Sequence, residues 1–113
     1  MDLDTGYKHT PALVEEVVQF LHPTPGGVYV DATLGEGGHG AALLRASAPS
    51  GHLIAIDRDA EVLEVARQRL RPFGPRVDIV HGHAADLRRI LDDLRVPHVD
   101  GILLDLGMSS YQL

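Results

Sequence analysis

The sequence predicts an α/β fold in which a doubly wound parallel sheet is covered by helices on both faces. Short aliphatic runs begin at positions 28, 53, 77 and 102, which are 25, 24 and 25 residues apart, and helical patterns fill the intervals. A glycine-rich turn follows the first run. This alternation is typical of βαβ units, whose right-handed crossovers build a parallel sheet. We expect at least four parallel strands, at residues 28–30, 53–56, 77–80 and 102–104.

A helix over about residues 10–22 is expected before the first strand. Thr10 is a suitable N-cap, Pro11 fits the first helical position, and Pro23 ends the pattern. The apolar residues in between recur at helical spacing, namely Leu13, Val14, Val17, Val18 and Leu21.

Three further helices are expected between the strands, at residues 41–46, 60–70 and 85–94. Each of these segments has apolar residues at helical spacing, and Asp59 is a good N-cap for the second. The helices would cover the sheet, so that its strands are buried on both sides.

Composition and charge limit the class of protein. The chain has 113 residues, no cysteine and a net charge of −6, from 10 Lys+Arg against 16 Asp+Glu. This length fits one domain or part of one, and the lack of cysteine excludes a disulfide framework or a thiol nucleophile. The acidic balance argues against this stretch alone gripping a polyanion. Because no apolar run approaches the roughly 18 residues that span a bilayer, we expect a soluble cytoplasmic protein without a membrane partner.

The turn after the first strand has the glycine spacing of a nucleotide-binding loop. Gly35, Gly37 and Gly40 match the G-x-G-x-x-G pattern between a predicted strand and a predicted helix. Glycines allow the backbone to turn sharply and to approach a ligand, and the free amides of the helix start point at that ligand. A tight βα turn without a ligand is the alternative interpretation.

An acidic residue at the end of the second strand indicates an adenosine ligand. Asp57 lies twenty residues beyond Gly37, where an acid in this architecture accepts the hydroxyls of a ribose. Both dinucleotides and S-adenosylmethionine carry that ribose. Glu36 and Asp31 would repel a pyrophosphate but attract a sulfonium and an amino group, which favours S-adenosylmethionine. An NAD-dependent oxidoreductase and a non-catalytic nucleotide-binding domain remain as alternatives.

A third carboxylate, Asp105, follows the fourth predicted strand. Ligands of doubly wound sheets bind outside the carboxyl ends of the strands, so Asp31, Asp57 and Asp105 should surround one crevice. His81, His83 and Asp86 could be drawn as a metal cluster, but no fourth ligand accompanies them, and we expect no metal.

Four segments carry a resemblance to a known family. Residues 7–11, 30–39, 55–59 and 100–110 closely resemble the bacterial S-adenosylmethionine-dependent enzymes that methylate a small-subunit (16S) ribosomal RNA cytosine on N4. The resemblance covers essentially the whole chain and implies a class I methyltransferase (Rossmann-like) core. It also implies a role for each matching residue. Gly37, Gly38 and His39 would contact the cofactor S-adenosylmethionine, Asp57 would bind its ribose, and Asp105 and Gln112 would complete the pocket.

The chain departs from that family in two ways. Ala84 stands after the third strand, where the family usually has an aromatic residue near the adenine. Family members are also longer, so we expect residues 1–113 to be the N-terminal part of the methyltransferase domain, truncated after the fourth strand. Such a fragment would contact ribosomal RNA mostly through regions outside it and would be inactive alone. Asp105 and the backbone carbonyls of residues 108–110 are the candidates for the acceptor of the amine proton, and we take Asp105 as the catalytic residue.

Overall fold

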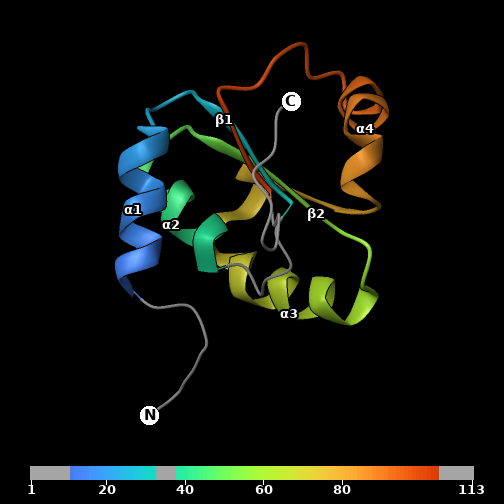
Figure 1. Cartoon of the computed structure of the whole chain (residues 1–113), viewed down its shortest axis with the longest axis horizontal. Helices are drawn as coiled ribbons and strands as arrows, with labels where there is room; N and C mark the ends of the chain where they lie inside the picture. Colours follow the sequence, from blue (N-terminus) through green and yellow to red (C-terminus); the bar gives the residue numbers. More distant parts are fainter. Residues whose placement is uncertain (1–10, 33–37, 105–113) are drawn as a thin grey trace.

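The sheet has four parallel strands in the order β3-β2-β1-β4 (Figure 1). This computed structural model describes residues 11–32 and 38–104. Strands β1 (Val28–Ala32) and β2 (His52–Asp57) form the centre, while β3 (Val77–His81) and β4 (Gly101–Leu104) lie outside them. The predicted doubly wound parallel fold is confirmed, and each strand includes the aliphatic run that predicted it.

The register brings the carboxyl ends of all four strands to one edge. Ala32, the last residue of β1, pairs with Leu104, the last residue of β4. Asp57, the last residue of β2, pairs with His81, the last residue of β3. The chain passes from β1 outward to β3 and then returns to the other side of β1 as β4, so a topological switch point lies between β1 and β4.

The helices divide between the two faces of the sheet. Helices α1 (Pro11–Leu21), α2 (Gly38–Ala46) and α3 (Ala60–Leu70) pack on one face, and α4 (Leu87–Asp93) covers the other (Figure 1). The division of α2, α3 and α4 follows from right-handed crossover connections. The connections from β1 to β2 and from β2 to β3 run in one direction across the sheet, and the connection from β3 to β4 runs in the opposite direction, so its helix lies on the other face.

Helices α2 and α4 begin earlier and later, respectively, than the sequence predicts. Helix α2 begins at Gly38 rather than at residue 41. The prediction started too late because the residues before Ala41 have no apolar pattern, although they are helical. Helix α4 begins at Leu87 rather than at residue 85, because a short 3₁₀ helix, η2 (Ala84–Asp86), precedes it.

Neither α2 nor any other helix of the described residues is long and apolar enough to cross a membrane.

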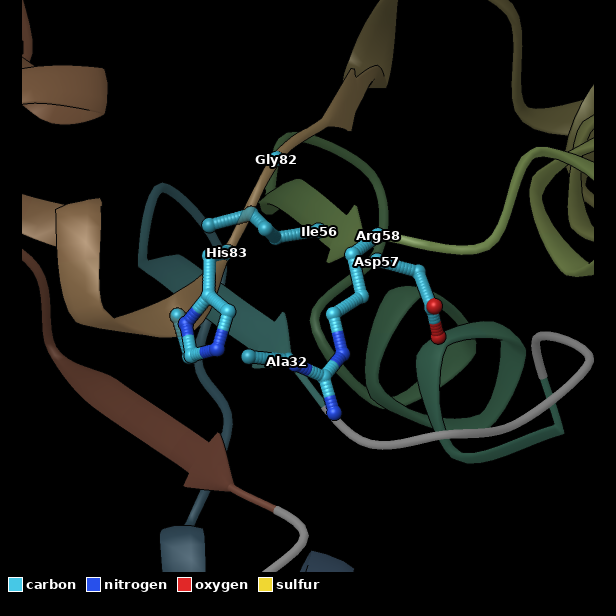
Figure 2. A pocket seen from close by; sticks show the side chains of 7 residues that line it. Ala32, Ile56, Asp57, Arg58, Gly82 and His83 are labelled. Atoms are coloured by element: carbon cyan, nitrogen blue, oxygen red, sulfur yellow. The ribbon is translucent and has the colours of Figure 1, made fainter.

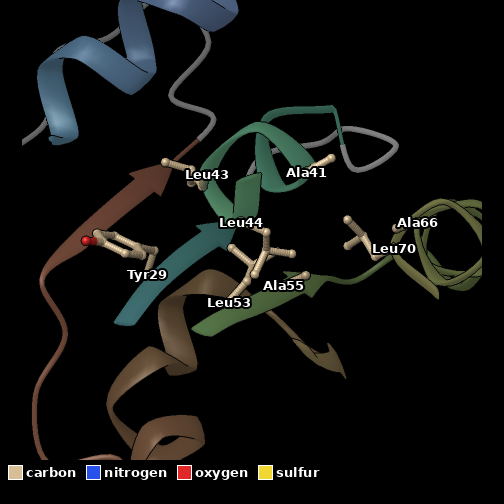
Figure 3. Packing of buried hydrophobic residues seen from close by; sticks show 8 residues of the cluster. All are labelled: Tyr29, Ala41, Leu43, Leu44, Leu53, Ala55, Ala66 and Leu70. Atoms are coloured by element: carbon tan, nitrogen blue, oxygen red, sulfur yellow. The ribbon is translucent and has the colours of Figure 1, made fainter. Parts of the chain in front are cut away.

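Alternate strand residues build a separate core on each face. On the α2 and α3 side, Leu43 and Leu44 of α2 pack against Tyr29 and Leu53 (Figure 3). The next residue of each of these strands points to the opposite face, as the two-residue period of a strand requires. Val30, Ile54, Ile56 and Ile90 are the buried residues there.

Arg76 ties the end of α2 to the sheet. It ends the 3₁₀ helix η1 (Arg71–Arg76), and its guanidinium Nη2 donates to the carbonyl of Leu44 at 2.6 Å. Its Nε donates to the carbonyl of Gly51 at 2.8 Å, just before β2. Carbonyls at a helix end lack intrahelical partners, so a cation there both satisfies them and complements the helix dipole.

Candidate nucleoside site

A cavity of about 130 Å³ opens at the carboxyl edge of the sheet (Figure 2). Its walls come from the ends of β1 and β2 and from the segment after β3, which places it where parallel α/β sheets bind ligands. The lining residues are Ala32, Ile56, Asp57, Arg58, Gly82, His83 and Ala84.

Asp57 is the buried charged residue of this cavity. Its side chain is 6% exposed, and its Oδ1 accepts a hydrogen bond from the backbone N–H of Asp59 at 2.9 Å. Its Oδ2 is buried and has no hydrogen-bond partner among the described residues. A buried acceptor without a donor costs roughly 1–3 kcal/mol. This oxygen therefore offers a place for a hydroxyl of a bound ligand, and the ribose of a nucleoside fits that requirement.

Asp59 caps α3, as the sequence predicts, and so leaves Asp57 available for a ligand. The Oδ1 atom of Asp59 accepts from the backbone N–H groups of Glu61 at 2.9 Å and Val62 at 3.4 Å. Asp57 and Asp59 thus have different roles, because only the side chain of Asp59 caps the start of α3.

Hydrogen bonds between the ends of β2 and β3 hold the cavity in shape. The N–H of Gly82 donates to the carbonyl of Asp57 at 2.9 Å, and Nε2 of His81 lies 3.0 Å from the carbonyl oxygen of Arg58. Nδ1 of His83 accepts from the N–H of Ala85 at 3.0 Å and caps η2. Both histidines thus bind backbone groups, and the described residues contain no cluster of three or more side chains that could hold a metal ion.

The start of α2 lies directly against β1 and β2. Asp31 and His39 are both buried, at 7% and 6% exposure. A Cβ at Gly40 would lie 2.7 Å from Cδ2 of Leu53 and 3.4 Å from Oδ2 of Asp31. The third glycine of the predicted loop therefore allows close packing of the helix on the strand. The carboxylate of Asp31 lies near the positive end of the α2 dipole, which stabilises its charge.

The structure brings together some of the predicted site residues. Asp57 and Ala84 line the cavity, while Gly38 and His39 belong to the first turn of α2. Gly37, Asp105 and Gln112 lie outside the described residues. Sequence reasoning missed Arg58 and His83 as lining residues, although their positions directly beside Asp57 and Ala84 in the sequence were a usable signal.

The family model and the curated relatives that match this chain agree on one family. The model of the MraW methylase family matches residues 6–113. Two curated relatives are named ribosomal RNA small subunit methyltransferase H. The one from Syntrophus aciditrophicus is 50% identical over 105 residues, covering 93% of this chain and 33% of that protein. The one from Syntrophotalea carbinolica is 51% identical over 107 residues, covering 95% and 34%. The chain thus spans about a third of the length of the curated relatives it matches.

A solved structure with low sequence identity shares the fold. The precorrin-6y C5,15-methyltransferase from Geobacter metallireducens superposes with a TM-score of 0.72 at 21% identity, covering 89% of this chain and 52% of that one. This likeness shows that the four-stranded sheet of this chain shares its Rossmann-like fold with that protein.

Proposed function

The chain belongs to the MraW methylase family, and from this premise we propose that it forms the cofactor-binding part of an enzyme that methylates small-subunit ribosomal RNA. The names of its relatives support methylation of small-subunit ribosomal RNA. The resemblance of its four sequence segments implies the N4 amine of a cytosine as the target. The observation that carries the proposal is the buried Oδ2 of Asp57, which lacks a donor beside a cavity at the carboxyl edge of the sheet. Ribosomal RNA as substrate also implies that the enzyme works in the cytoplasm.

The cofactor we propose is S-adenosylmethionine, which supplies an activated methyl group when bound. Asp57 would hold its ribose through Oδ2, while Oδ1 stays on the backbone of Asp59. Gly37, Gly38 and His39 would approach the cofactor near the start of α2. The negative charge of Asp31, in β1 beside the start of α2, favours a sulfonium and an amino group over a pyrophosphate, because opposite charges attract in a site shielded from water.

Methyl transfer requires the attacking nitrogen, the methyl carbon and the sulfur to lie in line. The cytosine amine is a weak nucleophile because its lone pair is delocalised into the ring, so an acceptor for its proton should help. We propose Asp105 for this role and Gln112 as a further pocket residue. Asp105 directly follows Leu104, whose partner in β1 is the cavity residue Ala32.

The RNA itself would be contacted mostly by sequence that this chain does not span. The chain has a net charge of −6, which gives little long-range attraction to phosphates, and it covers about a third of its relatives. We therefore expect the chain alone to bind the cofactor but not to transfer methyl groups to RNA.

The cofactor assignment can be tested by thermal shift with three ligands. S-adenosylmethionine and its demethylated product, S-adenosylhomocysteine, should raise the melting temperature of the chain, and NAD should not. Equal or better stabilisation by NAD would favour the oxidoreductase alternative. If none of the three shifts the melting temperature, the non-catalytic alternative is favoured.

The role of Asp57 can be tested by calorimetric titration with S-adenosylhomocysteine. Asp57→Ala should cost about 1.5–3 kcal/mol of binding free energy, the range for hydrogen bonds to charged groups, while the fold is kept. Asp59→Asn is the matched control, because asparagine caps a helix as well as aspartate does and Asp59 faces α3. Unchanged affinity in Asp57→Ala would mean that the ribose is held elsewhere.

A further inference from the structure

The positive charge of the chain is concentrated in one short run at the end of α3. Residues 67–76 contain four arginines and no acidic residue, although the whole chain has 16 Asp+Glu against 10 Lys+Arg. Arg67 and Arg69 lie in the last turn of α3. Arg71 and Arg76 are the first and last residues of η1. The negative net charge of the chain therefore hides a local excess of the opposite sign.

This run lies at the amino-terminal edge of the sheet, opposite the cavity. η1 leads directly into β3, and the guanidinium of Arg76 donates to the carbonyl of Gly51, just before β2. Its other hydrogen bond, to the carbonyl of Leu44, joins the run to the last turn of α2, which carries the exposed Arg45. β2 has six residues at about 3.3 Å each, so this edge is about 20 Å from the cavity at the other end of the strand.

The exposed cations at this edge have no acidic partners. Arg45, Arg69 and Arg71 are exposed, and no carboxylate of the described residues forms an ion pair with them. Arg76 is half-buried, and its guanidinium donates only to backbone carbonyls. We call these four arginines the basic edge. Together they present positive charge that nothing in the described part of the chain neutralises.

The two acids that flank residues 67–76 in the sequence already have partners. Glu64 lies 3.7 Å from Nε of Arg67, and the carboxylate of Asp78 lies 2.8 Å from Nε2 of His52. Exposed charges that are further apart than about 10 Å are largely screened at about 0.1 M salt. Acidic residues elsewhere on the chain therefore weaken long-range attraction of a polyanion but do not cancel the local field of the basic edge.

The support of the basic edge is rigid and offers no open aromatic face. Pro72 and Pro75 each fix a φ angle in η1. Phe73 packs against the core, and the guanidinium carbon of Arg76 lies 5.8 Å from the centre of its ring. Proteins bind unpaired bases by stacking them on exposed aromatic side chains, whereas they bind RNA helices through phosphates and overall shape. The basic edge therefore fits paired RNA better than unpaired RNA.

We propose that the basic edge binds the phosphate backbone of a double-helical segment of the RNA substrate. This rests on the proposed function, in which small-subunit ribosomal RNA is the substrate. Arginine suits the task because its guanidinium stays charged and can donate two parallel hydrogen bonds to one phosphate. Contacts to phosphates carry no sequence information, so the basic edge would add affinity and orient the RNA without selecting the target nucleotide.

The basic edge is tested by fluorescence anisotropy with the chain and a labelled RNA duplex at low salt. The unaltered chain should bind the duplex, with an affinity that falls as salt is added. Replacing Arg69 and Arg71 together by glutamine should weaken binding about tenfold and reduce the slope of log affinity against log salt by about 1 per arginine. Replacing Arg88 and Arg89 of α4 by glutamine is the matched control, because it removes the same charge from the opposite face. This control should bind the duplex as the unaltered chain does.

A melting curve for each variant separates RNA binding from stability. Arginines near the end of a helix also complement its dipole, so the Arg69 and Arg71 double variant should melt slightly lower even though it folds. A purely structural role would change the melting temperature and leave the salt slope as it is. That result would overturn the proposal, as would equal loss of binding in the α4 control or no binding of the duplex by the unaltered chain.

Two competitors identify other occupants of the basic edge. Single-stranded RNA of the same length should compete less well than the duplex, and polyglutamate of equal charge should compete poorly, because its carboxylates are not spaced as the phosphates of a helix are. If the single strand competes better, the basic edge does not recognise paired RNA. If polyglutamate competes as well as the duplex, the surface fits an acidic protein instead, and the proposal is wrong.

Failure of this proposal can be distinguished from failure of the proposed function. S-adenosylhomocysteine should bind the Arg69 and Arg71 double variant with unchanged affinity, because the basic edge is remote from the cavity. If Asp57→Ala loses cofactor binding but the double variant keeps full duplex binding, only the role of the basic edge is wrong. If the double variant loses duplex binding but no cofactor stabilises the chain, the cofactor assignment fails and the basic edge keeps its role.

Discussion

Strands β2 and β4 both lead to a candidate site carboxylate, but they are held very differently. β2 is paired on both sides and five of its six residues are buried, whereas β4 pairs only with β1 among the described residues and all four of its residues are half-buried. Asp57 therefore ends the best-packed strand, while Asp105 follows an edge strand. The carboxylate proposed to hold the cofactor thus ends a buried central strand, and the one proposed for the reaction follows a half-buried edge strand.

A groove beside β4 makes the contrast sharper. It lies between α1 and β4, and it is lined by apolar residues that include Val17, Ile102 and Leu103. Phe20 on its rim is 86% exposed. In β2, by contrast, Leu53 is fully buried under α2 (Figure 3). An open edge strand with apolar neighbours is a surface that needs a cover or invites association.

The largest expected effect compares one substitution in the two strands. Leu53→Ala should lower the free energy of unfolding by about 3–4 kcal/mol, because it leaves a cavity in a closed core. Leu103→Ala should cost only about 1 kcal/mol, because its side chain is half-buried beside the groove. Urea unfolding of both variants measures the difference. Equal losses would show that β4 is packed as firmly as β2.

An intermediate effect is expected where α2 meets β2. Gly40→Ala places a Cβ 2.7 Å from Cδ2 of Leu53, and overpacking of this kind costs about 1–3 kcal/mol, partly offset by the better helix propensity of alanine. In the Leu53→Ala background the clash is gone, and the same change should be neutral or stabilising. A double-mutant cycle in urea should therefore give a coupling above about 1 kcal/mol. Additive losses would mean that Leu53 moves aside freely.

The smallest expected effect lies on the β4 side. Phe20→Ser should change the free energy of unfolding by less than about 0.5 kcal/mol, because the ring is mostly exposed already. It should nevertheless reduce self-association in sedimentation experiments, since it removes the largest apolar group on the groove rim. Glu16→Gln, on the same groove, is a control that leaves the apolar surface intact. A large loss of stability in Phe20→Ser would contradict the view of this face as uncovered.

The sequence predicted the strands well, because a residue pattern there has one main structural cause. Regular spacing of aliphatic runs predicted the strands, because burial on both faces leaves a clear pattern, and the same spacing predicted that Asp57 ends a buried strand. The start of α2 was missed because glycine and histidine have low helix propensity, and tertiary packing against Leu53 overrides it.

The sequence could not predict which exposed polar side chains line the cavity, because that depends on where each side chain points. Arg58 and Arg76 look equivalent in the sequence, yet one lines the cavity and the other binds carbonyls at the end of α2. His83 likewise lines the cavity and accepts a hydrogen bond from the N–H of Ala85, which no sequence pattern reveals. The cofactor-binding and catalytic roles of all the predicted site residues stay predictions, and Gly37, Asp105 and Gln112 lie outside the described residues.

The two hydrogen bonds of Arg76 also bear on how the chain assembles. They join Leu44 and Gly51 to a residue 32 and 25 positions later, and so close a long loop around β2 and α3. Closing such a loop has an entropic cost, which the two hydrogen bonds and the surrounding packing offset only when α2, β2 and η1 are all folded. These elements should therefore open as one cooperative unit, and their amide protons should exchange with solvent together, while those of α4, on the opposite face, exchange independently.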